Sequence, residues 1–337
     1  MSAAAPRVAV VGAGAWGTTL ADLLTRKGAA VTIWAYEPEV VAGINRDHVN
    51  AIFLPGAPLA AALCATGDVV EAVRGAEVIV CATPSHAVRA VMTKAAAAAR
   101  ERPLVVSVSK GLEPERQERL SCVLQDVFGL GVPVAVLSGP SFAREVYERQ
   151  PTAVVAAAAD HDVAQQVQRV FATASFRVYS HTDVVGVELG GALKNVIAVA
   201  AGIAEGLGLG HNPRAALITR GLAELTRLGH VLGADPLTFA GLAGLGDLVL
   251  TATGALSRNR SLGVELGQGR RLEDILSSRK TVAEGVTTAR TAVQLGERHG
   301  VELPIASEVS AIVFAGKSPR QAIADLMERA PKPEQWR

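Results

Sequence analysis

Lys194 is the residue whose position in the sequence most directly suggests chemistry. On a helix the residues three, four and seven positions away are all uncharged: Val187, Gly190, Gly191, Ile197, Ala198 and Ala201. An amine with apolar neighbours either finds a partner elsewhere in the chain or has a lowered pKa. The simpler alternative is that its apolar stem covers the helix surface while the amine reaches water. Lys194 alone fits both interpretations. The other motifs of the chain decide whether a catalytic or a solvated lysine is expected.

A glycine-rich segment near the N-terminus has the spacing of a dinucleotide site. Gly12, Gly14 and Gly17 follow the apolar run Val8–Val11 and precede a helical pattern, which is the strand–turn–helix context that this motif requires. Gly12 permits the tight turn, Gly14 lets the backbone approach a pyrophosphate, and Gly17 lets the helix lie close to the strand. The free N–H groups and the dipole at the helix start favour the anion. We therefore expect NAD or NADP as the cofactor.

The choice between NAD and NADP stays open at the end of the expected second strand, Ala30–Trp34. Glu37 has about the spacing of a residue that binds the ribose hydroxyls of NAD. It could equally begin the next helix beside Pro38, where acidic residues are favoured. No arginine stands there to bind the 2′-phosphate of NADP.

Polar residues follow three further strands, where ligands of doubly wound sheets gather. The segments are Thr83–His86, Ser109–Gly111 and Ser138–Ala143. Lys110 in the second segment could also be an ordinary solvated lysine. Gly139 and Ser141 in the third could form a plain turn with a helix cap. For His86 a position at a helix start is favoured over a catalytic role, because no acid lies near it in the sequence.

Two segments of the second half could bind a phosphorylated substrate. Asp247 is the carboxylate of a glycine-rich, otherwise apolar segment, 241–248. Ser257, as an N-cap, would begin a short helix with Arg258 and Asn259. Free N–H groups, the helix dipole and a bidentate guanidinium together suit a phosphate. The alternative for Arg258 and Arg260 is a solvated basic turn.

The elements that must position these residues change type near residue 182. Before it, apolar runs alternate with helical stretches, which predicts a Rossmann-type, doubly wound, mainly parallel sheet. After it, the spacing predicts an all-helical domain. The expected strands are Val8–Val11, Ala30–Trp34, Glu77–Cys81, Leu104–Val108, Pro133–Leu137, Ala153–Ala157 and Phe176–Tyr179. The expected helices are Ser85–Ala99, Glu115–Phe128, Val163–Ala172, Thr182–Glu205, Pro213–Leu232, Leu262–Gly267, Thr287–Gly300 and Pro319–Met327. We expect a dinucleotide-binding domain over 1–182, a helical substrate-binding and catalytic domain over 183–330, and a polar tail over 331–337.

Composition excludes several other classes of protein. The chain has 337 residues with 33 basic and 32 acidic side chains, so its net charge of +1 gives no reason to expect nucleic acid as a partner. Its longest uncharged run, His48–Gly67, contains Pro55 and Pro58, so we expect no membrane insertion. The cysteines lack the spacing of a metal site or a redox pair and are expected to be reduced core residues of a cytoplasmic protein: Cys64, Cys81 and Cys122.

These motifs together resemble the bacterial NAD(P)-dependent glycerol-3-phosphate dehydrogenase family over nearly the whole chain. The matching segments are Gly12–Gly17, Ser109–Gly111, Ser138–Ala143, Gly186–Asn195, Gly241–Asp247, Ser257–Asn259 and Val282–Gly285. The resemblance implies that Lys194 is the general acid and base acting on the oxygen at C2 of the substrate. It implies a substrate site of Lys110, Gly139, Ser141, Lys194, Asp247, Ser257, Arg258 and Asn259. It implies a cofactor site of Gly12, Gly14, Ala15, Trp16, Gly17, Tyr36, Lys110, Ala143, Arg258, Val282 and Glu284.

The implied activity is reversible reduction of dihydroxyacetone phosphate, a phosphorylated triose, to sn-glycerol 3-phosphate for glycerophospholipid biosynthesis. A lysine with its ordinary pKa of about 10.4 is a poor base at neutral pH, and Lys110 is the expected second cation that lowers it. Tyr36 departs from the basic residue often found there in NADP-preferring members. The alanine- and glycine-rich helical half could form a homodimer interface. Two other functions fit part of the pattern: a 3-hydroxyacid dehydrogenase, against which the phosphate-suited Ser257–Asn259 argues, and a nucleotide-binding sensor without turnover.

Overall fold

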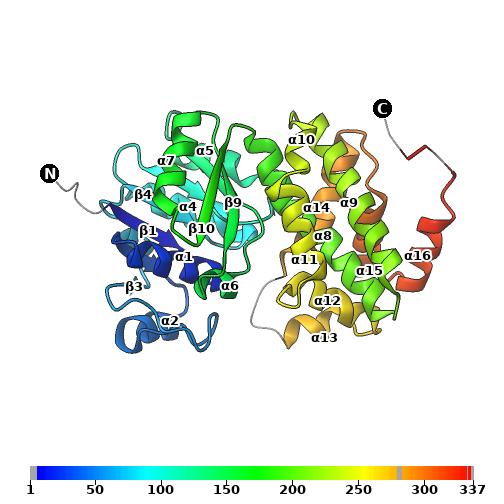
Figure 1. Ribbon diagram of the computed structural model, residues 1–337, viewed down its shortest axis with the longest axis horizontal. Helices are drawn as coiled ribbons and strands as arrows, with labels where there is room; N and C mark the ends of the chain where they lie inside the picture. The colour runs from blue at the N-terminus through cyan, green and yellow to red at the C-terminus, as the bar shows by residue number, and fades with distance from the viewer. Residues whose placement is uncertain (1–5, 279–282, 332, 335–337) are drawn as a thin grey trace.

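The N-terminal half of the chain forms one eight-stranded sheet, as the alternating pattern predicted (Figure 1). The computed structural model describes residues 6–278, 283–331 and 333–334. The strand order is β10-β9-β8-β5-β4-β1-β2-β3, and every neighbouring pair is parallel except β8 and β9. Its strands are β1 (Arg7–Val11), β2 (Ala30–Trp34), β3 (Cys64–Thr66), β4 (Val78–Cys81), β5 (Leu104–Ser107), β8 (Val134–Ser138), β9 (Thr152–Ala157) and β10 (Phe176–His181).

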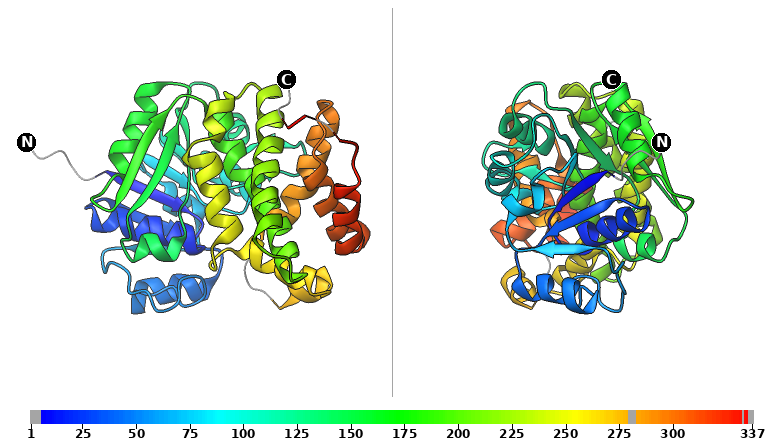
Figure 2. Two further views of the ribbon diagram at one scale, coloured as in Figure 1. Left: turned by 45° about the vertical axis from the view of Figure 1, so that its right-hand side comes forward. Right: turned by 90° about the vertical axis from the view of Figure 1, so that its left-hand side faces the viewer.

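Helices cover both faces of this sheet (Figure 2). On β1, Val8 and Val10 belong to the apolar core shared with α1 and α7, whereas Ala9 and Val11 belong to the core shared with α3, α4 and α5. Burial on both faces explains why the strands are continuous apolar runs. The helices of this half are α1 (Ala15–Arg26), α2 (Pro38–Ala42), the π-helix η1 (Gly43–Asp47), α3 (Val69–Val73), the 3₁₀-helix η2 (Ser85–Ala87), α4 (Val88–Ala96), α5 (Leu120–Phe128), α6 (Ala143–Tyr147) and α7 (His161–Phe171).

After β10 the described chain is helical, and α8 runs through the middle of this half (Figure 1). Asp183 begins α8 because its Oδ1 accepts the Gly186 N–H at 2.8 Å. α8 and the stretch Pro236–Thr253 are long and apolar enough to cross a membrane, but 89% of the apolar window of α8 is buried inside the protein. The helices are α8 (Val184–Gly206), α9 (His211–Val231), α10 (Pro236–Phe239), the π-helix η3 (Leu242–Gly246), α11 (Asp247–Thr253), α12 (Arg258–Gly267), α13 (Leu272–Ser277), α14 (Glu284–Arg298), α15 (Pro304–Ala315) and α16 (Pro319–Met327).

The expected helix Glu115–Phe128 is wrong at its start. Residues up to Arg119 form an antiparallel hairpin of β6 (Leu112–Glu113) and β7 (Glu118–Arg119), and α5 begins only at Leu120. Gln117 has φ +54° at the turn of this hairpin, a conformation that a helix excludes. Leu112 is buried in the core of the helical half, so a tertiary contact holds the hairpin.

Other differences are smaller. The expected helix Ser85–Ala99 begins as the 3₁₀-helix η2 and ends at Ala96, and α15 was not expected from the helical spacing. All three cysteines are free, but the expectation that they are core residues holds only for Cys81, because Cys64 is exposed and Cys122 is half-buried. The expected tail, 331–337, lies largely outside the described residues.

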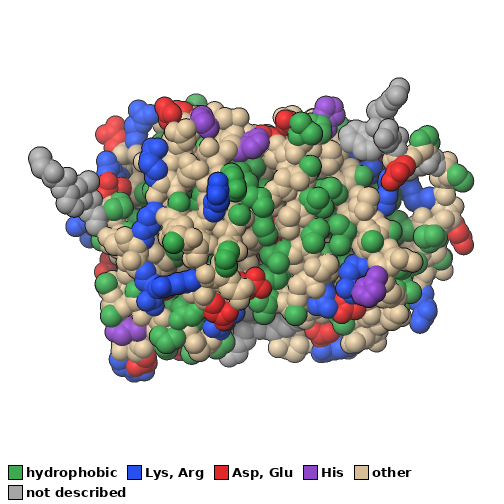
Figure 3. All heavy atoms as spheres, viewed as in Figure 1, with side chains coloured by type: hydrophobic (Ala, Val, Ile, Leu, Met, Phe, Trp, Pro, Cys, Tyr) green, Lys and Arg blue, Asp and Glu red, His purple; other side chains and the backbone are tan. Residues whose placement is uncertain are grey.

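The surface of the molecule is divided unevenly between apolar and charged side chains. On the face shown in Figure 3, hydrophobic side chains gather in a central band, where α10 and α11 lie in Figure 1. Leu237 on α10, Leu245 at the end of η3 and Val249 on α11 are exposed. Most Lys, Arg, Asp and Glu side chains on this face lie to either side of the band.

Candidate active site

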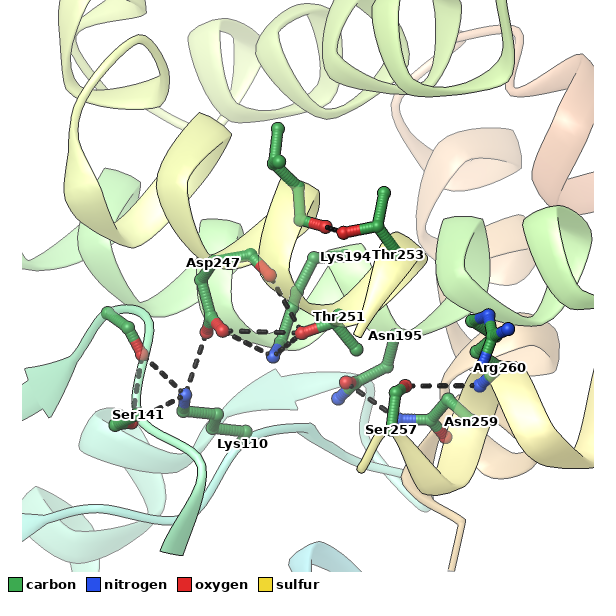
Figure 4. A network of polar contacts seen from close by, with 12 residues as sticks. Lys110, Ser141, Lys194, Asn195, Asp247, Thr251, Thr253, Ser257, Asn259 and Arg260 are labelled. Atoms are coloured by element: carbon green, nitrogen blue, oxygen red, sulfur yellow. Dashed lines mark hydrogen bonds and ion pairs between the residues drawn. The ribbon is translucent and has the colours of Figure 1, made fainter. Parts of the chain in front are cut away.

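Lys194 lies in the buried interior, with 5% of its surface exposed, so the solvated alternative is excluded. Its Nζ donates to Asp247 Oδ1 at 2.6 Å and to Thr251 Oγ1 at 2.5 Å (Figure 4). Thr251 Oγ1 in turn donates to the Asp247 carbonyl oxygen at 2.7 Å. The partner that the helix itself could not supply therefore comes from α11, more than fifty positions along the chain.

Asp247 joins Lys194 to a second lysine. Lys110, which follows β5, donates from Nζ to Asp247 Oδ2 at 2.7 Å and to the Gly139 carbonyl oxygen at 2.9 Å. Ser141 Oγ lies 3.4 Å from the same Nζ. One carboxylate, 1% exposed, thus connects a strand end of the sheet to the central helix of the other half (Figure 4).

Two adjacent glycines of α8, Gly190 and Gly191, allow η3 and the end of β8 to pack against this helix. A Cβ on Gly190 would lie 2.6 Å from the Ala243 carbonyl oxygen, and a Cβ on Gly191 would lie 2.4 Å from Ser138 Oγ. The Ala243 oxygen is a backbone atom, so only glycine at position 190 lets η3 pack here, whereas a side chain at position 191 would displace the Ser138 hydroxyl at the end of β8. Both glycines lie one turn before Lys194, which brings the two segments to its side chain.

Burial and charge act in opposite directions on this cluster. Burial is the largest influence on Lys194 and lowers its pKa to about 8, helped by the positive charge of Lys110 and opposed by Asp247. Burial favours the neutral form of Asp247, but Lys110 and Lys194 together outweigh it and lower the pKa of that carboxyl. The cluster therefore holds an ionised carboxylate beside an amine that titrates near neutral pH.

The start of α12 at Ser257 is connected to α8 next to Lys194, because a residue of its first turn is hydrogen-bonded to Asn195. Ser257 Oγ accepts the Arg260 N–H at 3.2 Å, which confirms the expected N-cap of α12. Asn259 Nδ2 donates to Asn195 Oδ1 at 2.8 Å, so the first turn of α12 is tied to the residue after Lys194. Arg258, the first residue of α12, is exposed, and desolvation by its surroundings lowers the pKa of its guanidinium.

Arg260 has a different role from Arg258. Its Nε donates to Glu205 Oε2 at 2.9 Å, and a second hydrogen bond reaches Oε1 at 2.5 Å. Arg260 therefore fixes α12 to α8 through a bidentate ion pair. The solvated basic turn that was the alternative in the sequence is therefore excluded for Arg260, which is half-buried and paired, whereas Arg258 is exposed.

The glycine turn has the geometry of a dinucleotide site. Gly12 has φ +119°, and a Cβ on Gly17 would lie 1.9 Å from the Gly12 carbonyl oxygen, so both positions require glycine. A Cβ on Gly14 would meet nothing within 4 Å, which leaves open space beside the backbone. The first turn of α1, from Ala15, holds no acidic side chain that would repel a pyrophosphate. Trp16 Nε1 is buried without a hydrogen-bond partner among the described residues.

Several predicted cofactor residues lie around this turn. Thr19 Oγ1 donates to the Ala143 carbonyl oxygen at 3.2 Å, so α6 begins against α1. Tyr36 is 82% exposed after β2. Glu37 begins α2 before Pro38 but makes no side-chain cap, so both interpretations of this carboxylate stand. Val282 lies outside the described residues.

Glu284 at the start of α14 reaches across to the sheet. It accepts Ser85 Oγ at 2.6 Å on Oε2 and the Ser85 N–H at 3.2 Å on Oε1. A Cβ on Gly111 would crowd both Ser85 and Glu284, so the turn after Lys110 passes directly beside this pair. His86, next to Ser85, is exposed within η2, as the preference for a helix start implied.

Three polar residues of the site were not predicted as site residues: Ser85, Asn195 and Thr251. Thr251 had a usable signal, because it follows Asp247 by one helical turn and so shares its face. Asn195 adjoins Lys194, but its orientation toward α12 depends on how α8 and α12 pack. Among the described residues no three His, Cys, Asp or Glu side chains form a metal-binding group.

Comparison with known proteins matches both halves of the chain. A family model described as NAD-dependent glycerol-3-phosphate dehydrogenase N-terminus matches residues 7–164, and one described as the C-terminus of the same enzyme matches residues 183–324. Proteins named glycerol-3-phosphate dehydrogenase [NAD(P)+] are 54% identical in Geobacter metallireducens and 55% identical in Geobacter sulfurreducens. These matches cover 97% and 98% of this chain, and 98% and 99% of the respective relatives.

The fold has a matching solved structure. The crystal structure of glycerol-3-phosphate dehydrogenase from Coxiella burnetii superposes with a TM-score of 0.93 at 38% identity. The match covers 97% of this chain and all of that one.

Proposed function

Because the chain belongs to the NAD-dependent glycerol-3-phosphate dehydrogenase family, we propose that it catalyses the reversible reduction of dihydroxyacetone phosphate to sn-glycerol 3-phosphate. NADH or NADPH is the reductant, and the product supplies glycerophospholipid biosynthesis. The observation that carries this proposal is the buried cluster of Lys110, Asp247 and Lys194 beside the start of α12.

Lys194 is the general acid and base in this proposal. A bound dihydronicotinamide supplies a hydride to the carbonyl carbon of the substrate. As the oxygen at C2 gains negative charge, the Lys194 ammonium donates a proton to it. In the oxidation of glycerol 3-phosphate the neutral amine removes that proton instead. A pKa of about 8 lets both forms exist near neutral pH.

The remaining cluster residues hold Lys194 and the substrate in place. Asp247 and Thr251, one turn apart on α11, both accept hydrogen bonds from the amine and fix its position. Lys110, with the Gly139 carbonyl and Ser141 beside it, lines the substrate side of the cluster. These fixed groups orient the reacting oxygen without further reorganisation.

The start of α12 binds the substrate phosphate. Ser257, Arg258 and Asn259 contribute a hydroxyl, a guanidinium and the free N–H groups of the first turn. The Asn195–Asn259 hydrogen bond sets the position of this phosphate site relative to Lys194. Phosphate binding then holds the carbonyl carbon in place, so remote binding energy assists the chemical step.

The glycine turn holds the cofactor pyrophosphate in this proposal. The other cofactor residues line the rest of the cofactor site, between this turn and the cluster of Lys110, Asp247 and Lys194. The residues are Gly12, Gly14, Ala15, Trp16, Gly17, Tyr36, Lys110, Ala143, Arg258, Val282 and Glu284. Supporting this assignment, Gly14 has open space beside it and α1 begins without an acidic side chain.

The activity is tested by following reduced-nicotinamide oxidation with dihydroxyacetone phosphate, using NADH and NADPH in parallel. Lys194→Ala is expected to bind NADH normally and to lose turnover by a factor of about 100 or more. Lys94→Ala, which alters an exposed lysine on α4, is the matched control and should keep full activity. Cofactor binding without turnover in the unmodified protein would favour the sensor function, and turnover on an unphosphorylated 3-hydroxyacid would overturn the substrate assignment.

The boundary between the two domains falls at about residue 182 in this proposal, giving domains over 1–182 and 183–330. Sheet residues end with β10 at His181 and α8 begins at Val184, which supports it. We place the protein in the cytoplasm, because its three cysteines are free and the apolar helix α8 is a core helix.

The chain acts as a homodimer in this proposal. Leu237 on α10, Leu245 on η3 and Val249 on α11 are exposed apolar side chains, and they support an interface with a second copy at these elements. Light scattering should give twice the 34.8 kDa of one chain, and Leu237→Asp should shift the mass toward one chain. A single-chain mass for the unmodified protein at micromolar concentration would refute the dimer.

A further inference from the structure

The glycine turn is held by two side chains that come from opposite directions. The Ala13 carbonyl oxygen accepts Thr18 Oγ1 at 3.1 Å and Asn50 Nδ2 at 2.8 Å. Asn50 Nδ2 also donates to Thr18 Oγ1 at 2.8 Å, which closes a three-membered network. Thr18 and Asn50 are both completely buried. Each buried polar atom of this network is therefore satisfied within the protein.

The network fixes the orientation of one peptide plane. In a planar trans peptide the carbonyl of Ala13 and the N–H of Gly14 point in opposite directions. The carbonyl points inward to Thr18 and Asn50, so the Gly14 N–H points away from these two side chains. A Cβ on Gly14 would meet nothing within 4 Å, so the space beside this residue is open. No oxygen of the described residues accepts a hydrogen bond from this N–H.

We propose that Asn50 is a positioning residue for the cofactor pyrophosphate, holding the Ala13–Gly14 peptide with its N–H toward the phosphate oxygens. Asn50 itself touches no cofactor atom in this proposal. It acts through the carbonyl of Ala13, with Thr18 as the second donor. A peptide that was free to turn would present its carbonyl oxygen to the phosphates and repel them.

Asn50 is itself held rigidly, although it lies outside the strand–turn–helix motif. Its Oδ1 accepts the Phe53 N–H at 3.0 Å, so both ends of its amide are bonded and their orientation is fixed. Leu54 and Leu59 of the same segment are buried in the core that contains Leu20 of α1. The segment between β2 and β3 is thereby anchored to the helix that begins at the glycine turn.

The test replaces one donor group without changing the size of the side chain. Asn50→Asp keeps the acceptor for Phe53 but places a carboxylate oxygen against the Ala13 carbonyl. NADH and ADP-ribose, which share the pyrophosphate, are each titrated at pH 8. We expect their Kd values to rise by about tenfold, the effect of one misplaced buried hydrogen bond. The KM for dihydroxyacetone phosphate and kcat at saturating NADH should stay within about twofold, because the substrate cluster is unchanged.

Asn45→Asp is the matched control, because it makes the same change in the same segment. Asn45 Nδ2 donates to the Ala65 carbonyl at 2.8 Å, and its Oδ1 accepts the Ala65 N–H at 2.8 Å, away from the glycine turn. We expect a lower Tm for this variant and unchanged Kd values for NADH and ADP-ribose. The proposal is overturned if Asn50→Asp binds both ligands as the unmodified protein does, or if Asn45→Asp weakens them equally.

A second pair of variants keeps the test informative if Asn50→Asp does not fold. Thr18→Val removes one of the two donors to Ala13, and Thr18→Ser keeps it. We expect the Kd of NADH to rise about threefold with valine, since Asn50 still donates, and to be restored by serine. Equal weakening by valine and serine would show that shape, not the hydroxyl, matters and would contradict the proposal.

Discussion

Two opposing influences act on the pKa of Lys194. Burial lowers it by favouring the neutral amine, and the carboxylate of Asp247 raises it by favouring the ammonium. A second buried acid, Glu224 on α9, takes no part in the active site. It accepts the N–H groups of Ile305 and Ala306 at 2.7 and 3.3 Å, at the start of α15. The pKa of Lys194 is lowered to about 8 and that of Glu224 is raised to about 7. Both groups therefore change charge near physiological pH, and each predicts a measurable pH dependence.

The rate of glycerol 3-phosphate oxidation should rise with pH and level off above a midpoint near pH 8. Oxidation needs the neutral Lys194 amine, and burial lowers the pKa of Lys194 to about 8. Asp247→Asn removes the charge that raises this pKa, so its lower residual activity should show a midpoint at more acidic pH. The profiles are measured as kcat/KM at saturating NAD or NADP. An identical midpoint in both proteins would contradict the assigned role of Asp247.

Glu224 should make the protein less stable at alkaline pH. Burial raises the pKa of Glu224 from 4.5 to about 7, and the N–H groups of Ile305 and Ala306 oppose this only partly. A raised folded-state pKa for an acid means that its contribution to stability is full below about pH 4.5 and falls as pH rises through about 7. Glu224→Gln cannot ionise. Between pH 5 and 8 the unmodified protein should therefore lose on the order of 3 kcal/mol relative to this variant.

The comparison for Glu224 is made by urea unfolding at both pH values. If the unfolding free energies of the unmodified protein and Glu224→Gln differ by the same amount at both pH values, Glu224 keeps an ordinary pKa.

Among the elements, α8 and α12 pack with their backbones in close contact at paired glycines. A Cβ on Gly202 would lie 2.1 Å from the Arg260 carbonyl oxygen, and a Cβ on Gly263 would lie 2.2 Å from the Val199 carbonyl oxygen. Both obstacles are backbone atoms, which cannot move aside as a side chain can. This contact sets the distance between Lys194 on one helix and Arg258 at the start of the other.

Gly202→Ala should push α12 away from α8 and weaken phosphate binding. We expect a loss of about 1–3 kcal/mol of unfolding free energy from overpacking. The KM for dihydroxyacetone phosphate should rise several-fold, while the KM for NADH stays nearly constant, because only α12 moves relative to Lys194.

Gly210→Ala serves as the control for Gly202→Ala, since a Cβ there meets nothing within 4 Å and its φ of −82° suits alanine. Equal effects of both substitutions on the KM for dihydroxyacetone phosphate would contradict the packing argument.

Across the whole molecule, the sheet half and the helical half both contribute residues to the candidate active site and are joined by buried polar contacts. Glu188 on α8 accepts the Ser121 N–H at 2.8 Å, Ser121 Oγ at 2.5 Å and Arg119 Nη1 at 3.2 Å. A helix of one half therefore caps the start of α5 in the other. Arg298 on α14 adds a contact with Gln117 of the β6–β7 hairpin.

Glu188→Ala should destabilise the molecule by about 2–3 kcal/mol, because it leaves a buried N–H and hydroxyl without their acceptor. Glu118→Ala is the matched control, since Glu118 pairs with Arg89 inside the sheet half and its side chain is 34% exposed. That loss should be below about 1 kcal/mol. Both values come from denaturant unfolding. A smaller effect for Glu188 than for Glu118 would mean that the two halves are held together elsewhere.

The sequence by itself determined the architecture and identified most residues of the candidate site. The glycine turn after Val8–Val11 and the repeated apolar runs predicted the doubly wound sheet, and these predictions are confirmed because spacing and turn chemistry are local properties. The isolated Lys194 and the lone carboxylate Asp247 could also be identified, since an unpaired charge in an apolar stretch is visible without a structure.

Only the tertiary structure decided which of these groups meet. The pairing of Lys194 with Asp247 and Thr251 depends on how α11 packs against α8, and no local spacing encodes it. The β6–β7 hairpin was missed because Leu112 is buried by the helical half, where a long-range contact overrides local helical spacing. The role of Asn50 could not be predicted from the sequence for the same reason. Its partner, the Ala13 carbonyl, is a backbone group 37 positions away, and the type of a side chain does not show which distant backbone group it will contact.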